Sequence, residues 1–175
     1  MTTAFETVLV LLFGICLVVV VPTVRKLCRR CHIEDLSPEW LENFSVTSYH
    51  MMEHLLSDED FNFLSRQPGF DLSLYRKLRR DRLYIFRQYL NRMISDFNRL
   101  HLAARLLAAQ APEDQSSLMA KLIWLKVRFS SSVVRAEFRY LLCHAGMRSL
   151  SVRVLILRLE ELSAELATLS ALQTA

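Results

Sequence analysis

The feature that most constrains this chain is a run of 18 uncharged residues, 7–24, close to its N-terminus. Twelve of the fourteen residues in 8–21 are Val, Leu, Ile or Phe. A helix needs roughly 20 mostly apolar residues to cross the hydrocarbon core of a bilayer. Four basic residues follow the run at once: Arg25, Lys26, Arg29 and Arg30. We therefore predict that residues 1–24 form a single transmembrane helix.

Two features indicate that this helix is retained as a signal anchor. A cleaved signal peptide has a basic N-terminal region and a cleavage site of small residues. Here the N-terminus carries Glu6 without any Lys or Arg, and no Ala-x-Ala pattern follows the run. Because basic flanks stay on the cytoplasmic side, we expect the N-terminus outside and the remaining domain in the cytoplasm. The expected location is the cell membrane, with residues 25–36 as a basic juxtamembrane linker.

Glycine and proline are scarce in the rest of the chain. The whole sequence holds three Gly and four Pro, which argues against a turn-rich β architecture and favours long helices. We expect an all-α domain in residues 37–175, folded as an antiparallel helical bundle because its long helices are joined by short connections. Short acidic helices are expected within 37–67, and long helices at about 71–110, 116–145 and 148–172.

Each predicted long helix has an apolar stripe that advances in steps of three and four residues, as one face of a helix requires. The first stripe consists of Leu83, Phe86, Leu90, Met93, Phe97, Leu100, Ala104 and Leu107. The second consists of Leu118, Leu122, Leu125, Phe129, Val133, Ala136, Tyr140 and Cys143. The third consists of Val152, Leu155, Leu159, Leu162, Leu166 and Leu169. We see no obvious buried polar position in these helices.

Charge is segregated along the domain. Residues 33–71 hold nine acids and one base, whereas residues 72–110 hold nine bases and two acids. The two segments either attract each other within one fold, or the basic one forms a surface for anionic lipid or, less favoured, nucleic acid. The candidate lipid- or anion-binding residues are Arg25, Lys26, Arg29, Arg30, Arg76, Lys77, Arg79, Arg80, Arg82 and Arg87.

One set of cysteines and histidines gives the metal hypothesis. Cys28 and Cys31 form a C-x2-C pair, and His50 and His54 form an H-x3-H pair after a gap of 18 residues. Zinc fingers have a gap of about 12 to 15 residues, so this one is long. The hypothesis is a structural zinc ion that fixes the domain close to the membrane.

Two shorter patterns overlap this set. Residues 28–32 match the C-x-x-C-H pattern of covalent haem attachment, but the basic flank places them in the cytoplasm. Residues 50–54 match the H-x-x-E-H pattern of inverzincin peptidases, with Glu53 as the base, but no marked acidic ligand follows downstream. Our leading interpretation therefore has no cofactor.

The sequence shows neither a glycine-rich phosphate loop nor a Ser-His-Asp or Cys-His arrangement. Our leading hypothesis is a membrane-anchored scaffold module without catalysis, which binds an unknown protein partner or self-associates. The predicted interface is the last helix, because of its leucine stripe and the small residues Ala164, Ala167 and Ala171. The stripe has an alternative role, which is to close the core. A zinc site and an anionic-lipid surface are the alternative functions.

Overall fold

The computed structural model describes residues 6, 14, 21–27, 37–54, 63, 66, 71–110, 115–144 and 153–174. Within these residues the fold is helical and contains no strand. The three long helices are α5 (Leu72–Gln110), α6 (Gln115–His144) and α7 (Arg153–Thr174). The short elements before them are α2 (Pro38–Glu42), the 3-10 helix η2 (Val46–Tyr49) and α3 (Met51–His54). The prediction of an all-α fold is confirmed.

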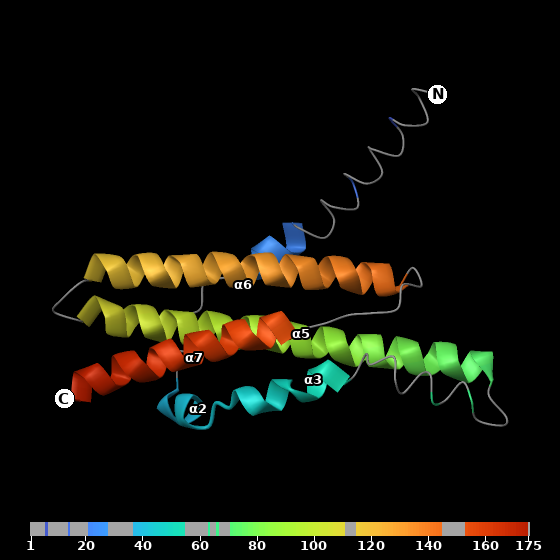
Figure 1. Cartoon of the computed structure of the whole chain (residues 1–175), viewed down its shortest axis with the longest axis horizontal. Helices are drawn as coiled ribbons and strands as arrows, with labels where there is room; N and C mark the ends of the chain where they lie inside the picture. Colours follow the sequence, from blue (N-terminus) through green and yellow to red (C-terminus); the bar gives the residue numbers. More distant parts are fainter. Residues whose placement is uncertain are drawn as a thin grey trace.

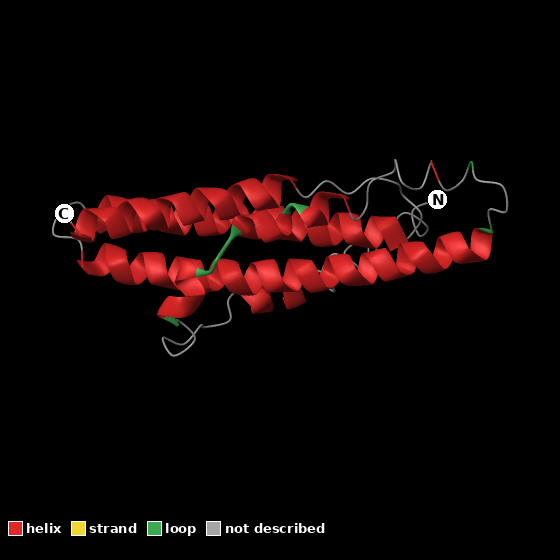
Figure 2. Ribbon diagram, turned by 90° about the horizontal axis from the view of Figure 1, so that it is seen from below, coloured by secondary structure: helices red, strands yellow, loops and turns green. Residues whose placement is uncertain are grey.

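The long helices form a three-helix bundle. α6 runs back along α5, and α7 runs back along α6 (Figure 1). Each pair among α5, α6 and α7 is in contact, and the view turned by 90° shows the same elongated shape (Figure 2). The elements η2 and α3 lie alongside the bundle, and η2 contacts α7.

The start of α5 has a clear local cause. The backbone N–H of Ser73 donates to the Asp71 carboxylate at 2.9 Å, and the Ser73 hydroxyl bonds to the same carboxylate. These bonds cap the first turn of the helix, whose N–H groups have no partner within the helix. They also lower the pKa of Asp71. Capping therefore fixes where the longest helix of the chain begins.

The predicted transmembrane helix lies almost wholly outside the described residues. Only Glu6, Gly14 and residues 21–24 of its range are described. In the described part of the chain, no helix has both the length and the apolar character needed to cross a bilayer. Residues 21–27 are helical, so the predicted basic linker, 25–36, begins inside a helix.

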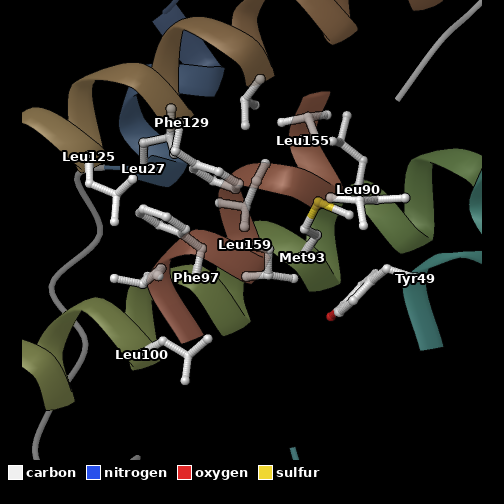
Figure 3. Packing of buried hydrophobic residues seen from close by; sticks show 14 of the residues in the cluster. Leu27, Tyr49, Leu90, Met93, Phe97, Leu100, Leu125, Phe129, Leu155 and Leu159 are labelled. Atoms are coloured by element: carbon white, nitrogen blue, oxygen red, sulfur yellow. The ribbon is translucent and has the colours of Figure 1, made fainter. Parts of the chain in front are cut away.

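The core is made by the three stripes seen in the sequence. Seven of the eight stripe residues of α5 are buried, as are six of eight in α6. At the centre, Phe97 of α5 and Phe129 of α6 stack face to face with ring centroids 3.7 Å apart. Figure 3 shows these two rings between leucines of α5, α6 and α7. Steps of three and four residues therefore identified the buried faces correctly.

The leucine stripe of α7 belongs to this core. The residues Leu155, Leu159, Leu162, Leu166 and Leu169 are all buried against α5 and α6. The stripe therefore closes the bundle, and the expectation that it serves as an interface is wrong. Ala164 and Ala167 of the same helix are exposed, whereas the side chain of Ala171 lies outside the described residues.

The expectation that the core helices hold no buried polar position is also wrong. Asp96, Asn98 and His101 of α5 and Glu137 of α6 are buried. Asp96 accepts a hydrogen bond from the Tyr49 hydroxyl, and Glu137 accepts one from Arg87 at 3.2 Å. These residues lie beside the stripes rather than in them, and other elements cover them. The residue pattern of a single helix does not show which other elements will bury its side chains.

Candidate functional site

The end of the N-terminal segment is built into the bundle. Thr23 and Leu27 are buried, and Leu27 lies beside Phe129 of α6 (Figure 3). The Lys26 ammonium donates to Asn91 Oδ1 at 2.7 Å, and Asn98 Nδ2 donates to the Lys26 carbonyl at 3.3 Å. The Asn98 bond therefore fixes the backbone of this segment to α5. Residues 21–27 are therefore held by both apolar and polar contacts.

The docked segment and the η2 segment lie on opposite sides of α5. Asn98 contacts Lys26, whereas Asp96 accepts the hydroxyl of Tyr49. Because successive helical residues turn by about 100°, positions 96 and 98 differ by about 200° around the axis. The η2 side also carries an ion pair to α7, from His50 Nε2 to Glu160 Oε1 at 3.3 Å. α7 therefore belongs to one side of α5, and residues 21–27 to the other.

An open groove of about 590 Å³ lies between α5 and α6. Its α5 wall is formed by His101 and Arg105. Its α6 wall is mostly apolar and consists of Met119, Leu122, Ile123, Lys126, Val127 and Ser130. None of these eight lining residues is acidic. The groove therefore combines an apolar wall with two cations.

His101 forms the buried floor of this groove. Its Nε2 lies 3.2 Å from the carbonyl oxygen of Leu122, and its ring stacks on Phe97. Because a carbonyl only accepts, the neutral ring carries its proton on Nε2. Burial, followed by the positive charge of Lys126, lowers the pKa of His101 to about 4, although the bond to Leu122 opposes the shift. His101 is thus a neutral hydrogen-bond donor that joins α5 to α6.

The predicted basic surface of α5 is divided by the fold. Arg79 donates to the carbonyl of Cys143 at 2.8 Å, and Arg87 pairs with buried Glu137 and lies 5.1 Å from the centre of the Tyr140 ring. Both side chains therefore join α5 to α6. Of the four other candidates on α5, three are exposed: Arg76, Lys77 and Arg80. The fourth, Arg82, is half-buried.

The juxtamembrane candidates have different positions. Arg25 is exposed, Lys26 is half-buried against Asn91, and Arg29 and Arg30 lie outside the described residues. Lys26 is therefore partly a structural residue. Nothing in the sequence pattern distinguishes it from its basic neighbours.

Only one of the four proposed zinc ligands, His50, has a described side chain. Cys28, Cys31 and the side chain of His54 lie outside the described residues, and His50 faces Glu160 of α7. The described part of the chain contains no group of three or more His, Cys, Asp or Glu side chains able to hold a metal ion. The zinc site stays a prediction. The haem pattern, 28–32, lies outside the described residues, and so do the side chains of Glu53 and His54 in the peptidase pattern.

The outward face of α6 is the largest feature that the sequence interpretation missed. Ile123, Trp124 and Val127 are 60%, 55% and 60% exposed, and Phe138 is 45% exposed. Arg128 lies over the Trp124 ring at 4.0 Å from its centre. The sequence feature that could have predicted this face is a second run of apolar residues beside the buried stripe of α6.

The comparisons with known proteins add no family to these observations. No family model, curated protein or solved structure matches the chain. The function must therefore be argued from the residues described above.

Proposed function

We propose that the chain is a single-pass membrane protein whose helical bundle is a protein-interaction module without catalysis. The anchor is proposed from the apolar run at 7–24 and its basic flank. The docking of Lys26 and Leu27 supports a direct join between anchor and bundle. In this arrangement the N-terminus lies outside the cell, and the bundle lies against the cytoplasmic surface of the membrane.

The surface that we assign to a protein partner is the outer face of α7. Val154 and Leu157 are 44% and 51% exposed, and Glu161, Ala164 and Thr168 continue the same face in steps of three and four. Small residues allow a second helix to approach closely, because the distance between helix axes depends on the side chains at the contact. The face lies opposite the side where residues 21–27 dock, so it is turned away from the proposed anchor.

A photo-crosslinking amino acid at position 157 of the full-length chain tests this proposal in membranes. We expect a crosslinked protein adduct from position 157, because Leu157 is exposed on the proposed interface. The matched control is the same probe at Gln88, an exposed position of α5, which should give no such adduct.

Two results would overturn the proposal. One is recovery of the chain in the soluble fraction, which contradicts the anchor. The other is the same adduct pattern at positions 88 and 157, which contradicts the interface on α7. A reporter after Ala175 that is active only outside the cell would reverse the proposed orientation.

A further inference from the structure

Among the described residues, no carboxylate pairs with the two cations of the α5–α6 groove. Arg105 and Lys126 form no ion pair with any residue that the structure describes, although Arg87, Lys121 and Arg158 each do. Arg105 is exposed and Lys126 is half-buried, and they approach one groove from facing helices. The groove is therefore electropositive and complementary to an anion.

The lowered pKa of His101 is a second indication that the groove is electropositive. After burial, Lys126 contributes most to the lowered pKa of His101, and Arg105 contributes further in the same direction. Both cations therefore act on the floor of the groove. A neutral His101 adds no third charge, so an anion would meet two cations above an uncharged floor.

The apolar wall supplies the second half of the recognition chemistry. Met119, Ile123 and Val127 follow one another at intervals of four residues along α6, so they share one face. Ile123 and Val127 are each 60% exposed, and the bundle core does not cover them. Apolar side chains beside two cations match an amphiphile that has an anionic head and a hydrocarbon tail.

The groove also lies on the same seam as the docked N-terminal segment. Asn98 holds the Lys26 carbonyl, and Arg105 follows seven residues later on the same face of α5. Seven helical residues span about 10 Å. Under the proposed anchoring, Arg25 and Lys26 mark the headgroup region of the bilayer, and the groove lies within reach of it.

We propose that this groove binds an anionic phospholipid of the membrane that holds the anchor. Arg105 and Lys126 bind the phosphate, and Met119, Ile123 and Val127 contact the first part of one acyl chain. The proposal rests on the proposed membrane anchoring, and it names a lipid as a second partner of the bundle. The site differs from the basic surface predicted on α5, because neither Arg105 nor Lys126 belongs to that set.

Native mass spectrometry of the full-length chain in detergent tests the phosphate contacts. The probes are phosphatidylglycerol and phosphatidylcholine, and we expect retention of phosphatidylglycerol in preference. Each basic residue near an anionic lipid adds to the affinity for it. The double variant Arg105→Gln/Lys126→Gln, which removes two of them, should therefore bind phosphatidylglycerol about thirty-fold more weakly. The matched control, Arg76→Gln/Arg80→Gln, removes two exposed cations of α5 and should change the affinity less than two-fold. Equal losses in the two double variants would overturn the proposal.

A second pair of variants tests the acyl-chain contact. Val127→Asn should weaken phosphatidylglycerol binding about five-fold through loss of apolar contact, whereas Leu157→Asn on α7 should not change it. Competition by glycerol phosphate, which has no acyl chain, should be negligible, and effective competition would overturn the acyl-chain contact. Membrane fractionation of each variant reports on the anchor separately. A chain that stays in membranes but shows no preference for phosphatidylglycerol would refute the groove alone.

Discussion

The outer faces of α6 and α7 are both exposed, but they differ in what surrounds them. α6 carries Ile123, Trp124 and Val127 beside a groove with two cations that form no ion pair among the described residues. α7 carries Val154 and Leu157 together with small and acidic residues. The segment 21–27 is bound to α5 through Asn91 and Asn98. The difference teaches that charge distinguishes two exposed apolar faces of one bundle, and on this difference we base the proposals of a lipid for the α6 side and a protein for α7.

The largest expected effect is on the free energy of unfolding. It tests whether the buried face of α6 contributes more to stability than the exposed face. Phe129 is fully buried and stacked on Phe97, so Phe129→Ala should cost about 3–5 kcal/mol of unfolding free energy. Ile123→Ala on the outer face should change it by less than about 0.5 kcal/mol. Thermal unfolding of the full-length chain in detergent, followed by circular dichroism, measures both. Similar costs would mean that the outer face is packed in the native state.

A second effect concerns the seam between α5 and α6. Burial lowers the pKa of His101 from 6.5 to about 4, so the unfolded state binds the proton more tightly than the folded state. Stability should therefore be complete above about pH 6.5 and should fall by about 3 kcal/mol as the pH drops toward 4. The comparison is unfolding at pH 7.5 and 4.5 for the wild type and His101→Gln. A wild type and a variant with identical pH dependence would refute the role of His101.

The smallest effect concerns the ion pair that joins the outer edges of α6 and α7. Lys121 Nζ lies 2.7 Å from Glu165 Oε2, but the lysine side chain is largely exposed. Exposed pairs contribute little, so Lys121→Gln should cost about 0.5 kcal/mol or less and should lose that effect at high salt. The same unfolding measurement at 0.05 and 1 M salt checks this salt dependence, because the screening length falls from about 14 to about 3 Å. A cost that is large and insensitive to salt would show that this edge is structurally important.

The sequence predicted the parts of the fold that depend on one helix at a time. Steps of three and four residues identified the buried faces of α5, α6 and α7, and the expected ranges 71–110, 116–145 and 148–172 lie close to the observed helices. The cap of α5 is equally local, because Asp71 bonds to Ser73 two positions later. These features depend on helical geometry and on local hydrogen bonds, and both can be read from neighbouring residues.

The parts that depend on contacts between elements were not predictable in the same way. Periodicity showed that α7 has an apolar face, but not that α5 and α6 cover it. It gave no sign that Asn98 would bind the Lys26 carbonyl, 72 positions away in sequence. The groove at Arg105 and Lys126 was missed for the same reason, because the two cations meet only when α5 and α6 pack.

The contact between Lys26 and Asn98 has a mechanical consequence. Because the carbonyl of Lys26 is fixed to α5, any helix continuing from residue 21 toward the N-terminus has a defined rotational phase relative to the bundle. Insertion of one residue before Thr23 would turn such a helix by about 100° and displace it by about 1.5 Å along its axis. Under the proposed anchoring, the bundle would then present a different side to the bilayer.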